Sequence, residues 1–66
     1  MDEEKRQRLQ KLGQQIKSSR LDHNMTQAKL AELIGVEVSH IWRIEKGKVE
    51  MKVLTYLNLR KALSLN

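Results

Sequence analysis

A small residue and a glycine stand four positions apart, at Ala31 and Gly35, and apolar residues flank them on both sides. Two short helices that meet at a steep angle around a tight turn need such an arrangement. Alanine lets the second helix come close, and glycine takes the positive φ that the turn requires. The residues able to fill the angle are Leu30, Ile34, Val36, Ile41 and Ile44. Residues 27–46 are therefore predicted to form either a helix-turn-helix motif or an ordinary hairpin of helices, and the spacing alone leaves both open.

Apolar periodicity and capping residues extend this prediction to the whole chain. Helices are expected over residues 2–23, 26–35, 37–47 and 52–63. Thr26 is a good N-cap, Asn24 tolerates the left-handed conformation after a helix, and Gly35 is suited to end one. The expected apolar positions, in chain order, are Leu9, Leu12, Ile16, Leu30, Ala31, Leu33, Ile34, Ile41, Ile44, Val53, Tyr56, Leu57, Leu59 and Leu63. With no proline and three glycines, the chain is expected to be all-α.

The composition narrows the classes of function. A chain of 66 residues is expected to be one domain, and without cysteine it has neither a disulfide nor a thiolate metal site. His23 and His40 lack the spacing of a helical metal pair. We therefore expect no metal, no cofactor and, without a nucleophile–base arrangement or a glycine-rich phosphate loop, no enzyme. The absence of an apolar leader or a membrane-spanning run points to the cytoplasm.

The net charge of +5 favours a polyanionic partner. The charge is spread evenly, with +2 over residues 1–33 and +3 over residues 34–66. A membrane or RNA binder that relied on charge alone would carry a denser basic block. RNA-binding modules also use stacking aromatic residues, of which this chain has only Trp42 and Tyr56. A binder of RNA or of an anionic membrane that relies on charge alone is therefore disfavoured, and a membrane is not an expected partner.

One further pattern resembles a known family, the lambda-repressor-like or Cro/XRE regulators of phages and bacteria. The residues that carry the resemblance are Met25, Thr26, Gln27, Leu30, Ala31, Gly35, Val36, Ile41, Arg43, Ile44, Glu45, Gly47 and Lys48, preceded by Leu12, Gly13, Ile16 and Arg20. The resemblance continues through Val53, Leu57 and Leu63 and covers about residues 12–65. It implies a compact helical bundle containing a helix-turn-helix. Residues 1–66 would then be a single DNA-binding domain, and residues 1–11 an N-terminal extension of its first helix.

The resemblance also assigns roles to individual residues. The helix near residues 37–45 would be the recognition helix in the major groove, and Arg20 with Glu45 would form a structural ion pair that orients it. The residues implied to contact DNA are Gln27 at a phosphate, Glu37, Val38, Ser39 and Arg43 at the bases, and Lys46 and Lys48 at the backbone. Arg43 is the favoured reader, since a guanidinium can bridge O6 and N7 of guanine. A solvated charge or a phosphate contact is the alternative for Arg43.

Several residues depart from the family pattern. Glu37 stands where a small N-cap is common, and glutamate caps poorly. Trp42 lies on the outer side of the expected recognition helix, where three interpretations stay open: contact with the DNA backbone, contact with a partner subunit, or partial burial. Leu54 occupies a usually polar position. A fifth helix, which forms the dimer in several relatives, is missing or reduced to residues 64–66.

Two functions follow from these expectations. The first is a sequence-specific transcription regulator, expected to be a repressor, that binds a palindromic operator as a homodimer on the nucleoid. The second is an antitoxin-like partner of a kinase-like toxin, in which DNA binding serves autoregulation. Burial of Trp42 and Leu54 against the toxin would favour the second.

Overall fold

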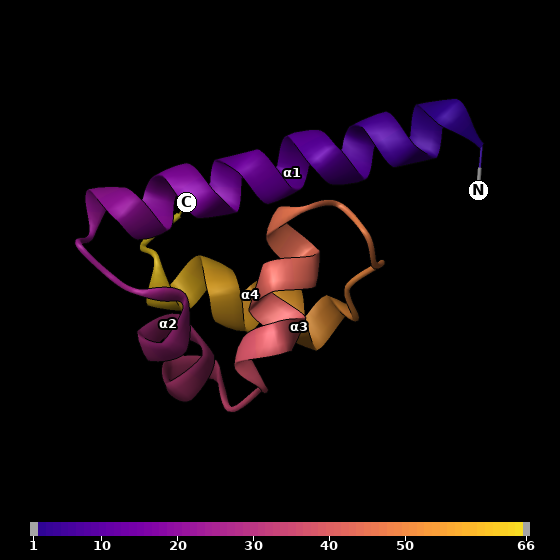
Figure 1. Cartoon of the computed structure of the whole chain (residues 1–66). Helices are drawn as coiled ribbons and strands as arrows, with labels where there is room; N and C mark the ends of the chain where they lie inside the picture. Colours follow the sequence, from indigo (N-terminus) through magenta and orange to yellow (C-terminus); the bar gives the residue numbers. More distant parts are fainter. Residues whose placement is uncertain (1, 66) are drawn as a thin grey trace.

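The computed structural model describes residues 2–65, which form four α-helices and no strand (Figure 1). The helices are α1 (Glu3–Asp22), α2 (Gln27–Ile34), α3 (Val38–Glu45) and α4 (Val53–Ala62). The expected all-α bundle of four helices is confirmed. The described residues form no fifth helix: residues 63 and 64 form a turn, residue 65 has no regular structure, and residue 66 lies outside the described part.

Local residues set most helix ends as expected. Asp2 caps α1, its carboxylate accepting a hydrogen bond from the Lys5 amide at 2.8 Å. Asn24 takes a φ of 56° in the turn that follows α1. The Thr26 hydroxyl caps α2 by accepting from the Lys29 amide at 3.0 Å, and Gly35 ends α2 with a φ of 73°. The predicted turn chemistry on both sides of α2 is thus confirmed.

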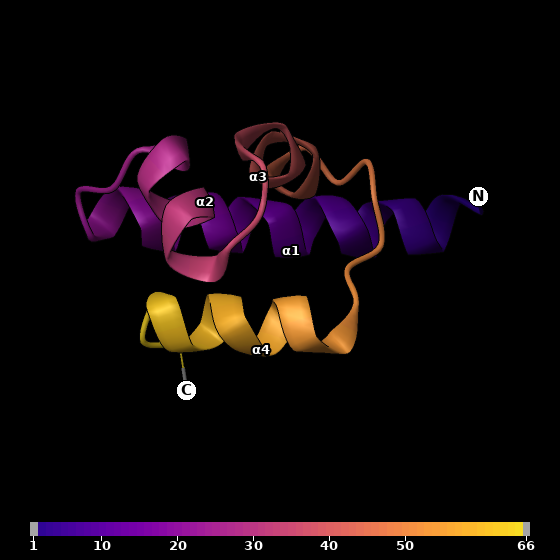
Figure 2. The same cartoon turned by 90° about the horizontal axis from the view of Figure 1, so that it is seen from below.

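The long helix α1 runs along one side of the other three (Figure 1). Seen from below, α3 and α4 lie on opposite sides of the line of α1 (Figure 2). α2 packs against both α3 and α4, and α1 packs against α3. The first turns of α1 extend beyond the end of α3 and past the loop that leads to α4. Within the described residues, no helix combines the length and apolar character that a membrane crossing needs.

Every helix contributes to one apolar core. Its buried members are Ile16, Leu30, Ala31, Ile41, Ile44, Leu59 and Leu63. The expectation that Leu33 faces inward is wrong, since its side chain is half exposed. α2 has only eight residues, and its contacts with α3 and α4 are made by Leu30, Ala31 and Ile34, which are buried or partly buried. Val53 and Leu57 of α4 are likewise exposed, at 75% and 52%.

A glycine brings α1 onto the end of α3. A Cβ atom placed on Gly13 would come within 2.6 Å of the carbonyl oxygen of Glu45, a distance that real side chains do not reach. The same geometry holds at Gly47, where a Cβ atom would lie 2.7 Å from the backbone of Gln10, and where φ is 71°. These two contacts hold the middle of α1 directly over the C-terminal end of α3.

Candidate nucleic-acid interface

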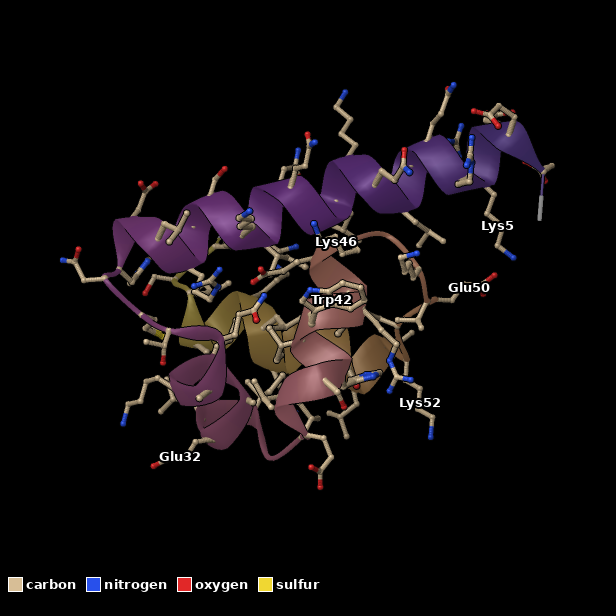
Figure 3. The ribbon with its side chains drawn as sticks, viewed as in Figure 1. Lys5, Glu32, Trp42, Lys46, Glu50 and Lys52 are labelled. Carbon is tan, nitrogen blue, oxygen red and sulfur yellow. The ribbon has the colours of Figure 1, made fainter. Side chains whose placement is uncertain are left out.

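α3 has one buried side and one exposed side. Ile41, Ile44 and Glu45 are buried, whereas Ser39, Trp42, Arg43 and Lys46 are exposed. At 3.6 residues per turn, those four exposed positions share one face of the helix. Trp42 projects from the outer face of α3, and Lys46 lies at its upper end beside α1 (Figure 3). The predicted base-facing residues Glu37, Val38, Ser39 and Arg43 are all exposed at this face or at its N-terminal edge.

The buried side of α3 is fixed by an ion pair. Arg20 donates to Glu45 from Nε at 2.7 Å and from Nη2 at 3.1 Å. The two side chains are only 8% and 2% exposed. Arg20 also donates from Nη1 to the carbonyl oxygen of Met25 at 2.8 Å. Arg20 and Glu45 thus form the bidentate pair that the resemblance implies, and it joins α1 to the last residue of α3 and to the chain entering α2.

Gln27 takes part in the same network. Its side-chain Nε2 donates to Glu45 Oε1 at 3.0 Å, and the residue is half-buried. An amide nitrogen carries two hydrogens, so one donor remains for another acceptor. Gln27 is also the first residue of α2, where backbone N–H groups lack partners within the helix. A phosphate contact by Gln27 stays a prediction, and the geometry leaves donors for it.

Glu37 precedes α3 without capping it. Its backbone is extended, and its side chain makes no capping hydrogen bond. This agrees with the low capping preference of glutamate. The carboxylate is exposed at the N-terminal end of α3, the end that enters the major groove in helix-turn-helix complexes. Glu37 is therefore free to meet a base edge but is repelled by phosphate.

Basic side chains surround the exposed face of α3. Lys46 lies over the Trp42 ring, with Nζ 5.8 Å from the ring centroid. Lys48 follows it and is exposed. Among the described residues, neither these lysines nor Arg43 has a carboxylate within ion-pair distance. Glu50 is paired with Lys5 at the far end of the loop (Figure 3). The face is therefore positively charged, apart from Glu37.

Sequence reasoning did not anticipate a hollow between α1 and α3. It is lined by Gln10, Gln14, Lys17, Arg20, Gln27, Trp42, Glu45 and Lys46. The signal in the sequence was the polar stripe at positions 10, 14 and 17, which follows a helical repeat. The sequence does not show how closely α1 approaches α3, and such a stripe is typical of an ordinary solvent-exposed face. Within residues 2–65, no three metal-ligating side chains gather.

The comparison with known proteins agrees with this geometry. No curated protein and no solved structure matches the chain significantly. A family model described as helix-turn-helix, of the Cro/C1 type, matches residues 16–65. This range includes α2, α3, the turn between them, and the Arg20–Glu45 pair, and it covers most of the chain. The chain belongs to the Cro/C1-type helix-turn-helix family, whose members bind DNA.

Proposed function

We propose that this protein is a sequence-specific regulator of transcription, which inserts α3 into the major groove of double-stranded DNA. The observation that carries the proposal is the exposed face of α3. Arg43 and Ser39 share this face with Lys46, and Arg43 has no ion-pair partner among the described residues. The buried Arg20–Glu45 pair holds the opposite side of the helix. A helix held in place on one side, with a guanidinium that has no ion-pair partner on the other, is suited to direct readout of bases.

The base-reading roles follow from the chemistry of each side chain. Arg43 bridges O6 and N7 of a guanine, a contact that discriminates by about 1–3 kcal/mol. Val38 contacts a thymine methyl group, and Ser39 bonds to a neighbouring base. Glu37 accepts from a cytosine amino group, since its charge excludes it from phosphate contacts.

Three other residues position the domain on the duplex. Gln27, Lys46 and Lys48 contact phosphates on the edges of the groove, which fixes register without reading sequence. Gln27 does so with its second amide hydrogen and with the N-terminal end of α2. Trp42 lies between these residues on the same face, beside Lys46. Of its three interpretations, we therefore favour contact with the sugar-phosphate backbone.

We further propose that the protein binds a palindrome as a homodimer and represses by covering a promoter. One copy offers few base contacts, and a dimer reads two half-sites about 34–36 Å apart. Exposed apolar residues on α4 support a subunit surface: Val53 and Leu54 are 75% and 67% exposed. A regulator of this kind works in the cytoplasm on the nucleoid, which is the location we propose.

The antitoxin function is the second candidate, and the exposure of Leu54 and Trp42 favours it. Leu54 and Trp42 would then be covered by a toxin rather than by a second copy or by DNA. Against this, Trp42 shares its face with Arg43 and Lys46, the side chains best suited to a polyanion. We therefore rank DNA-directed regulation first.

Selection from a randomised duplex pool at two salt concentrations tests the proposal. We expect the wild type to enrich a palindrome, and Arg43→Ala to lose preference at one base pair in each half-site. Arg8→Ala is the matched control, because Arg8 is exposed on α1 and, among residues 2–65, pairs with Glu4 alone. It should enrich the same palindrome as the wild type. Salt-sensitive binding without any enriched sequence would refute a sequence-reading role.

A further inference from the structure

The exposed side of α1 above α3 carries a polar stripe. Arg6, Gln10, Gln14 and Lys17 follow one another at intervals of four, four and three residues. At 3.6 residues per turn, this spacing puts them on a single face of the helix. The family match begins at residue 16, so three of the four residues precede it. Most of the stripe therefore lies outside the residues that match the family model.

Two hollows join this stripe to the end of α3. The first contains Gln14 and Lys17 together with Trp42. The second contains Arg6 together with Lys48. Gln10 and Lys46 line both, so the two hollows are adjacent, and together we call them the α1–α3 trough. Its position depends on the close approach of Gly13 to Glu45 and of Gly47 to Gln10.

The charge of the trough is positive. Lys17, Lys46 and Lys48 have no carboxylate within ion-pair distance among the described residues. The single carboxylate in the lining, Glu45, is buried and occupied by Arg20 and Gln27. Arg6 is engaged by Glu3, with Nη2 3.0 Å from Oε2. The trough therefore offers three uncommitted ammonium groups and the side-chain amides of two glutamines, with no unpaired acid among its lining residues.

We infer that the α1–α3 trough binds the phosphodiester backbone of one DNA strand, so that α1 extends the contact made by the helix-turn-helix. This inference rests on the proposed function. Ammonium and amide donors spaced along a groove are suited to consecutive phosphates. The Trp42 ring offers a flat apolar surface for the sugars between them. The strand leaves the α2 N-terminus at Gln27, passes Trp42 and Lys17, and reaches Lys46, Gln10 and Lys48.

Two pairs of variants test the inference on the duplex that the wild type selects. Lys17→Gln removes a charge inside the trough, and Lys11→Gln removes the same charge from α1 outside it, since Lys11 lines neither hollow. Gln10→Glu adds a carboxylate inside the trough, and Gln15→Glu adds one outside it. All four positions are exposed, so the fold should tolerate every change, and circular dichroism melting verifies this.

Binding is measured by anisotropy of the labelled duplex over a salt series. We expect Lys17→Gln to reduce the slope of log K against log salt by about one, and affinity at 0.1 M salt by roughly eightfold. Lys11→Gln should change the slope by much less. Gln10→Glu should weaken binding far more than Gln15→Glu. None of these variants should alter the enriched sequence, because phosphate contacts do not read bases.

The outcomes separate this inference from the proposed function. Failure of the wild type to bind any duplex would overturn both. Wild-type binding in which Lys17→Gln matches Lys11→Gln, and Gln10→Glu matches Gln15→Glu, would overturn the α1 contact and leave the regulator intact. A changed base preference in Lys17→Gln would also overturn it, since the lysine would then read bases.

Discussion

The side-chain amide of Gln27, the first residue of α2, donates at 3.0 Å to Glu45, the last residue of α3. The same carboxylate accepts two hydrogen bonds from Arg20 of α1. One buried acid therefore ties together three helices and orients the residue expected to meet a DNA phosphate. Since all the buried side-chain polar atoms in the described residues have partners, each member of this network depends on the others.

Arg20→Met should destabilise the fold strongly. The substitution leaves the charge of Glu45 buried with only the amide of Gln27 as a partner. Removing one side of a buried pair typically costs about 3–5 kcal/mol, which is a large fraction of the stability of a domain this small. Urea denaturation followed by circular dichroism measures the loss.

The double variant Arg20→Met with Glu45→Met is the control. Replacing both members of a buried pair by apolar residues is often neutral or stabilising, so it should recover most of the loss. A cost below about 1 kcal/mol for the single variant would show that the pair is more solvated than its burial indicates.

Most of the fold could be predicted from the sequence because its signals are local. Thr26, Gly35 and Asn24 act through their own backbone geometry, so the limits of α2 followed from residue type alone. The core positions of α3 followed from the spacing of Ile41 and Ile44. Leu33 could not be placed in this way, because its exposure depends on how far α4 reaches over α2.

In the candidate site, too, the features with a local sequence signal could be predicted, and those that depend on packing between helices could not. The exposure of Ser39 and Arg43 follows from the burial of the opposite side of one helix, which periodicity gives. The α1–α3 trough depends on the distance between two helices, which is set by Gly13 and Gly47. A glycine in a helix has many explanations in a sequence, and only the packed structure shows that it admits the backbone of α3.

Gly13→Ala should weaken both stability and DNA binding. The added Cβ atom meets the backbone of Glu45, at 2.6 Å from its carbonyl oxygen, so α1 must move away from α3. Overpacking of this kind typically costs about 1–3 kcal/mol, partly offset by roughly 1 kcal/mol from the better helix propensity of alanine. Thermal melting and the anisotropy titration measure the two effects.

Gly35→Ala is the control for Gly13→Ala, because it introduces backbone strain without moving α1 away from α3. Gly35 has a φ of 73° and nothing within 4 Å of an added Cβ atom, so alanine there costs about 1–2 kcal/mol through its backbone conformation alone. Compared at a temperature where both variants are folded, only Gly13→Ala should lose affinity for DNA. Equal affinities of the two variants for DNA would mean that the close packing of α1 against α3 does not contribute to binding.

The fluorescence of Trp42 should report DNA binding directly. Trp42 is the single tryptophan of the chain, and its side chain is 44% exposed on the proposed DNA-facing side. Contact with sugars or bases changes the surroundings of the ring, so its emission should change in step with duplex anisotropy. Trp42→Phe should fold normally, because partly exposed residues contribute little to the core.

Unchanged emission at a DNA concentration that saturates the anisotropy signal would place Trp42 outside the complex. A change produced instead by a protein partner would favour the antitoxin function. Added salt should reverse the DNA-induced change, since phosphate contacts release counterions.

Leu54→Lys should prevent dimer formation and weaken binding to a palindrome. Leu54 is 67% exposed on α4, so a lysine there costs the monomer little but puts a charge into an apolar subunit contact. Leu33→Lys is the matched control, because Leu33 is also exposed, at 51%, but on α2. Sedimentation equilibrium gives the oligomeric state, and titration with one or two half-sites gives the coupling between subunits.

Loss of the dimer in Leu54→Lys alone would assign the α4 surface to the second copy. A wild type that stays monomeric on a two-site duplex, with no cooperativity to lose, would contradict the homodimer and direct attention to a different protein on the same surface.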